Sequence, residues 1–92
     1  MRLERAVEIG QEAVGWLLLQ PDRLMELMIA SGATPQALPE LVGDHEFLGF
    51  ALDFLLGNDA TVIAFASATG LRPEEPAQAR AVLTGPDGAD WT

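Results

Sequence analysis

The most apolar stretch of the chain, residues 47–56, is hydrophobic on almost every side of a helix. Asp44, a residue type that caps helix N-termini, precedes it, and Gly57 follows it. Because a helix that is apolar all round has to be buried, residues 45–56 are predicted to form the central helix. Its non-apolar or tiny positions recur every three or four residues on one stripe: Glu46, Gly49, Asp53 and Gly57. We expect this stripe to be the side that other helices leave uncovered.

Apolar residues at helical spacing, interrupted by proline and glycine, predict further helices around the central one. Pro21 starts the second helix, and Gly32 and Gly70 occupy C-terminal cap positions. The predicted helices are 3–19, 21–31, 45–56, 60–69 with Asp59 as its cap, and a short C-terminal helix at 72–83. The expected fold is all-α, a compact bundle with residues 1–83 as a single domain and residues 84–92 as a flexible tail.

The predicted second helix buries Leu24, Leu27 and Met28, with help from Met25 and Ile29. Methionine at helical spacing is common in a core, but methionine-rich surfaces also adapt to varied partners. Met25 and Met28 are therefore candidates for an interaction site. The predicted fourth helix has an apolar side formed by Val62, Ile63, Phe65 and Ala66.

The sequence aligns with itself when it is shifted by 38 positions (54 minus 16). The shift places Trp16-Leu17-Leu18 on Phe54-Leu55-Leu56, Ala30 on Ala68, Gly32 on Gly70 and Pro35 on Pro73. Each copy reads as a long apolar helix, a three-residue break, a second helix, a capping glycine and a helix that starts with proline. Two related helix pairs packed face to face would bury what neither could bury alone. Chance similarity between two amphipathic helix pairs is the alternative.

Composition narrows the range of functions. The chain has 92 residues, 49% of them hydrophobic, and a formal net charge of -9. This charge repels phosphate backbones, so nucleic acid is not an expected partner. No apolar run approaches the ~20 residues of a membrane span, and the start of the chain leads into no signal-peptide core. We expect a soluble cytoplasmic protein without a membrane partner.

The inventory of catalytic side chains is small. The chain has no cysteine, tyrosine or lysine, one histidine, His45, and two serines, Ser31 and Ser67. A Ser-His-Asp set with Asp53 can be assembled on paper, but no nucleophile-elbow motif supports it. We therefore assign no catalytic residue, no cofactor and no metal site, and lean towards a protein that is not an enzyme.

Two further residues are candidates for a structural or interaction role. Asp53 lies among apolar neighbours, where a carboxylate is either solvated or bonded to something specific. If it caps a helix or meets an arginine such as Arg72 or Arg80, replacing it with alanine should cost more than ~1 kcal/mol. Trp91, in the polar tail, either docks on the domain or is a free recognition residue.

Two other classes of function remain open. One is a small metal- or ligand-binding enzyme that uses the carboxylates of Asp44, Glu46 and Asp53. The other is a helix-turn-helix regulator that places residues 22–31 or 59–69 in a DNA groove. The second of these segments has no basic residue, which disfavours it.

The central segment resembles a known family. Ala51-Leu52-Asp53-Phe54-Leu55-Leu56, followed by Asn58-Asp59, Ala64-Phe65-Ala66 and Gly70-Leu71-Arg72-Pro73-Glu74, is similar to a family of short, acidic bacterial proteins catalogued as a domain of unknown function (3572). The similarity spans residues 6–83. The resemblance implies a bacterial origin and a compact helical domain, and it carries no activity, cofactor or catalytic residue.

The function most consistent with these patterns is a non-enzymatic module for protein-protein interaction or self-association. An apolar groove or the methionine-bearing second helix would form the contact, with Met25, Met28, Asp53 and Trp91 as candidate residues. The acidic charge of the chain predicts that the partner surface is basic at its rim.

Overall fold

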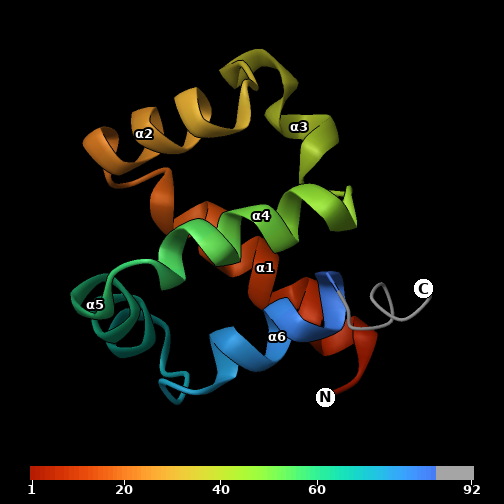
Figure 1. The fold of residues 1–92 in the computed structure, drawn as a ribbon, viewed down its shortest axis with the longest axis vertical. Helices are drawn as coiled ribbons and strands as arrows, with labels where there is room; N and C mark the ends of the chain where they lie inside the picture. The colour runs from red at the N-terminus through yellow and green to blue at the C-terminus, as the bar shows by residue number, and fades with distance from the viewer. Residues whose placement is uncertain (85–92) are drawn as a thin grey trace.

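The computed structural model describes residues 1–84, in which helices joined by short connections are the only regular elements and no strand occurs (Figure 1). The elements are α1 (Leu3–Leu17), α2 (Pro21–Ser31), the 3-10 helix η1 (Pro35–Ala37), α3 (Leu38–Leu41), α4 (His45–Leu56), α5 (Asp59–Thr69) and α6 (Glu75–Thr84). The all-α prediction is confirmed, and the bounds of α2 and α4 are as predicted. Helix α6 extends one residue into the expected tail, and Trp91 lies outside the described residues.

Short polar side chains cap the N-termini of α4 and α5. The Asp44 carboxylate accepts a hydrogen bond of 3.0 Å from the Glu46 N–H, as expected of the cap of α4. Helix α5 is capped by Asn58, whose side chain accepts from the Thr61 N–H at 3.1 Å. The predicted cap, Asp59, is instead the first helical residue, so the prediction was one residue late.

A glycine caps the C-terminus of α2 and another caps that of α5. Gly32 and Gly70 have φ values of 75° and 78°, in the left-handed region that favours glycine. The N–H of each donates to the carbonyl four residues earlier, on Met28 and Ala66 respectively. Both predicted C-terminal caps are thus confirmed, and each fixes where the chain turns away from its helix.

Helix α4 lies in the middle of the molecule, crosses α1, and packs along α6 (Figure 1). Its buried side chains belong to two adjoining hydrophobic clusters that also draw on α1, α2, α5 and α6. The fully buried residues of α4 are Leu48, Ala51, Leu52 and Leu55. Phe50, in contrast, is 39% exposed, so the helix is not buried all round.

Two glycines allow the central helices to approach closely. A Cβ atom placed on Gly10 of α1 would lie 2.9 Å from the Cβ of Leu48 on α4. A Cβ on Gly49 of α4 would lie 2.5 Å from the Cγ2 of Thr84 on α6. Real Cβ atoms do not come this close to other carbon atoms, so both crossings depend on the missing side chain.

The position of α6 corrects the prediction for the polar stripe of the central helix. Glu46, Gly49, Asp53 and Gly57 were expected on an uncovered side. Three of them are exposed, as expected, but Gly49 is buried and α6 packs over it. The physical reason is that glycine leaves room for a neighbouring helix, so α6 approaches at Gly49 while the carboxylates on either side stay exposed.

Two contacts join positions that the 38-residue shift pairs. Gly10 meets Leu48, and the Arg23 Nη1 donates a hydrogen bond of 2.6 Å to the Thr61 Oγ1. In both pairs the second number exceeds the first by 38. If the two segments are copies of one unit, contact between paired positions is what an approximate two-fold axis between them would produce.

Candidate functional site

Helix α2 has one buried side and one exposed apolar side. Leu27 is fully buried and Met28 is 8% exposed, as predicted for core residues. Met25 and Ile29, which were expected to help in the burial, are 65% and 76% exposed. The structure therefore places the two candidate methionines in different environments, with Met28 anchoring the helix and Met25 facing outward.

An open groove runs beside the exposed side of α2. Its volume is about 340 Å³, and almost all of the surface that lines it is apolar. The lining residues, called the α2 groove below, are Pro21, Leu24, Met25, Met28, Ile29 and Pro35. They come from α2 and from the start of η1, so the two prolines that begin these elements mark two sides of the groove. Apolar surface that is both concave and exposed is typical of interaction sites.

The charge beside this groove is acidic. Asp22 and Glu26 are exposed, and with Met25 and Ile29 they follow the i, i+3, i+4, i+7 spacing of a single helical face. Arg23 is the sole basic residue of α2, and its hydrogen bond to Thr61, which is 2% exposed, turns it towards α5. The exposed face of α2 thus combines apolar side chains with negative charge alone.

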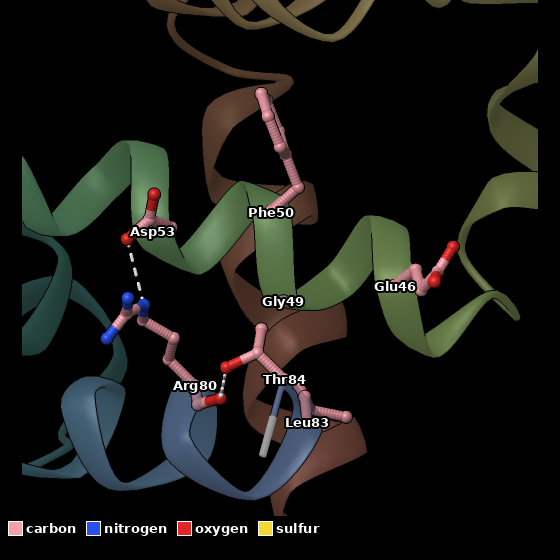
Figure 2. Close-up of a pocket in the computed structure, with 7 residues that line it drawn as sticks. All are labelled: Glu46, Gly49, Phe50, Asp53, Arg80, Leu83 and Thr84. Carbon is pink, nitrogen blue, oxygen red and sulfur yellow. Dashed lines mark hydrogen bonds and ion pairs between the residues drawn. The ribbon is translucent and has the colours of Figure 1, made fainter. Parts of the chain in front are cut away.

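A second pocket lies between α4 and α6 and has a volume of about 520 Å³ (Figure 2). It is lined by Glu46, Gly49, Phe50, Asp53, Arg80, Leu83 and Thr84. The Thr84 hydroxyl donates a hydrogen bond of 2.8 Å to the Arg80 carbonyl, within the last turn of α6. Gly49 lies opposite Thr84 in this view, so the pocket includes the point where the two helices approach most closely.

Asp53 forms an ion pair across this pocket. Its Oδ1 lies 2.8 Å from the Nε of Arg80, and Figure 2 shows the two side chains pointing towards each other. Nε itself is buried, but its N–H is not aligned with a hydrogen-bond acceptor among the described residues. The contact is therefore an ion pair at short range without an aligned hydrogen bond, between side chains that are 59% and 43% exposed. Of the two arginines proposed for Asp53, the partner is Arg80.

Arg72 is engaged elsewhere. Its guanidinium Nη1 lies 3.7 Å from the Oε2 of Glu74, and its backbone N–H donates a hydrogen bond of 2.8 Å to the Glu75 carboxylate. The second bond is a capping interaction just before α6, which begins at Glu75, three residues later than predicted.

The catalytic alternatives gain no geometric support. Within residues 1–84 no three histidine, aspartate or glutamate side chains converge to hold a metal ion, so Asp44, Glu46 and Asp53 do not form such a group. The Ser31 hydroxyl is already hydrogen-bonded at the end of α2. It donates a hydrogen bond of 3.3 Å to the Met28 carbonyl and accepts one of 3.2 Å from the Ala33 N–H.

The arrangement of α4 and α5 bears on two other interpretations, a DNA-binding helix-turn-helix and a membrane span. They are bent by 115° at their short break, an angle typical of helix-turn-helix pairs, but α5 contains no basic residue. No single helix of the described part is long and apolar enough to cross a membrane. Taken together, α4 and α5 do reach that length and composition, as a bent pair.

The sequence pointed to an apolar groove or to the methionine-bearing second helix as the contact, but it did not predict which residues line the groove or that an acidic face lies beside it. Met25 and Met28 were named as candidates, but hydrophobicity alone could not separate the exposed methionine from the buried one. The available signal was the placement of Asp22 and Glu26 on the same helical face as Met25 and Ile29. A face on which charged and apolar residues alternate in this way is seldom buried in a core.

Comparison with known proteins gives one match. A family model described as "Protein of unknown function (DUF3572)" matches residues 3–86. This match confirms the resemblance, which was expected over residues 6–83, and covers that whole range. Neither the curated proteins nor the solved structures contain a significant match.

Proposed function

The chain belongs to the DUF3572 family, whose function is unknown, and we propose that it is a non-enzymatic cytoplasmic protein that binds another protein through the α2 groove. The observation that carries this proposal is the exposure of Met25 and Ile29, at 65% and 76%, beside a concave surface that is almost wholly apolar. Exposed apolar side chains cost free energy in water, and covering them on association is favourable.

The dimensions of the groove suit a small, anchored contact. Helix α2 has 11 residues, which at about 1.5 Å per residue gives a contact length of roughly 16 Å. A surface of this length accommodates two or three anchor side chains of a partner, and such anchors carry most of the binding energy of an interface. Met25 and Met28 add flexible walls that can adjust to the shape of an anchor.

We also infer that the chain is a duplicated helix pair, in which α1 and α2 correspond to α4 and α5. The contacts of Gly10 with Leu48 and of Arg23 with Thr61 support this inference, as do the equal lengths of α2 and α5, 11 residues each. The duplication pairs Met25 with Ile63 of α5, which is 60% exposed but is not part of the α2 groove. Ile63 is therefore a matched control position.

Affinity capture from lysate of the native host tests the proposed function. The tagged wild-type protein is compared with Met25→Glu and with Ile63→Glu, and circular dichroism confirms that all three are folded. We expect one protein to be captured in stoichiometric amount by wild type and by Ile63→Glu, and to be lost from Met25→Glu. If Met25→Glu captures the same protein as wild type, the α2 groove is not the interaction site.

A further inference from the structure

We propose that the occupant of the α2 groove is an amphipathic helix of the partner, with an apolar stripe flanked by lysine or arginine. This inference rests on the proposed function of the groove. It adds the conformation and the charge of the segment that binds there.

The shape of the site favours a helix over an extended segment. Residues 1–84 contain no β-strand, so this part of the chain offers no sheet edge to which a strand could be added. The groove runs beside a straight helix and is lined by apolar atoms, with almost no polar group to pair with an exposed backbone. A helix satisfies its own backbone hydrogen bonds and presents only side chains, so it can enter such a groove without leaving unpaired N–H or C=O groups.

The distribution of charge favours a basic partner. The chain has five basic residues, and Arg23 is the only one between Arg5 and Arg72. Arg23 is held by Thr61 on the α5 side of α2, whereas Asp22 and Glu26 stand beside the exposed Met25 and Ile29. Figure 1 places α1's first turn and α6, which hold other arginines, at the opposite end of the molecule from α2.

The same charges disfavour a second copy of the chain as the occupant. Two copies that met through α2 would bring Asp22 and Glu26 of both copies to one interface, and each copy carries a formal net charge of -9. Like charges brought together in this way weaken association, whereas cations placed beside the same carboxylates speed encounter and select the partner.

Binding of two synthetic peptides to the full chain tests the proposal. Both peptides carry the same leucine stripe at i, i+3, i+4 and i+7 on a helical scaffold, and one is flanked by lysine and arginine, the other by glutamate. Fluorescence anisotropy should show that the basic peptide binds at least about 10-fold more tightly and that added salt weakens it. Ile29→Glu should abolish its binding, and Ile63→Glu should leave it unchanged.

Reversing the charge of Asp22 and Glu26 separates recognition of the peptide by the acidic face of α2 from attraction of the peptide to the net negative charge of the whole protein. The double variant Asp22→Lys/Glu26→Lys should bind the glutamate-flanked peptide more tightly than the basic one. The variant Glu4→Lys/Glu12→Lys, which changes the net charge equally at exposed positions of α1 outside the groove, should keep the preference of wild type. An unchanged preference in the first variant, or no detectable binding of the basic peptide to wild type, overturns the proposal.

Three outcomes distinguish a failure of this inference from a failure of the proposed function. If capture of the partner depends on Met25 but the peptides show no preference for basic flanks, the groove is an interaction site and the partner chemistry is wrong. If analytical ultracentrifugation shows a dimer of wild type that Met25→Glu dissociates, the occupant is a second copy and the amphipathic partner helix is ruled out. Capture that is insensitive to Met25→Glu removes the proposed function itself.

Discussion

Helices α6 and α2 both pack on the central pair of α1 and α4, but they do so in different ways. Helix α6 lies directly over Gly49, and its Leu83 reaches to within 3.4 Å of where a Cβ of Gly10 would be. Helix α2 touches the core through Leu27 and Met28 and leaves Met25 and Ile29 in solvent. Yet α2 is the more hydrophobic helix in sequence. Burial is therefore decided by whether a neighbour can approach, and small residues at a crossing matter more than the apolar content of the helix.

The largest expected effect is the difference in stability lost when a side chain is truncated in the core and on the exposed side of α2. Leu52→Ala removes a fully buried side chain of α4 and should lower the free energy of unfolding by about 3 kcal/mol, because it leaves a cavity. Ile29→Ala, on the exposed side of α2, should change it by less than about 0.5 kcal/mol. Urea denaturation measures both values. Equal losses would mean that Ile29 is covered within the free protein and that the comparison is mistaken.

A second prediction concerns the close crossing of α1 and α4. Gly10→Ala should destabilise the protein by about 1 to 2 kcal/mol, because the new methyl group would meet the Cβ of Leu48, which cannot rotate away. Gly15→Ala, in the same helix but with no atom within 4 Å of its Cβ position, should stabilise it by about 0.5 to 1 kcal/mol through helix propensity alone. Thermal melting followed by circular dichroism gives the sign of each change. Stabilisation by both substitutions would show that the helices separate without cost.

The smallest expected effect is at the border between α4 and α6. Asp53→Ala should cost less than about 1 kcal/mol, and less still in high salt, because the ion pair with Arg80 is largely exposed. The sequence suggested a larger cost, since it indicated the partner but not the exposure. Denaturation at low and high ionic strength measures the effect. A loss above 1 kcal/mol that persists in salt would show that Asp53 supports the packing of α6 by more than charge.

Much of the fold follows from local signals in the sequence. Asp44, Gly32 and Gly70 act within a few residues of their own positions, so the start of α4 and the ends of α2 and α5 could be predicted. The end of α1 was placed two residues late, at position 19, because Leu18 and Leu19 continue the apolar pattern although they are 47% and 75% exposed. Local apolar periodicity does not reveal that no neighbouring helix covers them.

The candidate site was harder to predict because it depends on tertiary packing. Asp53 was identified, and its partner was narrowed to two arginines, because a carboxylate among apolar residues requires compensation. Which side of α2 is buried could not be decided, since Met25 and Met28 are equally hydrophobic and lie three positions apart. In the structure, the buried side of α2 carries Leu27 and Met28, and Arg23 on this helix donates a hydrogen bond to Thr61, which is 38 residues away.

The junction of α1, α4 and α6 at Gly10 has a consequence for how the protein is made. Leu48 and Leu83 both reach this glycine, so residues from three distant parts of the chain must be present before the junction closes. Synthesis proceeds from the N-terminus, and α6 follows every other helix of the described residues. On the ribosome, α1 and α4 therefore remain without their covering helix until α6 has emerged, and the close-packed core can assemble only late in translation.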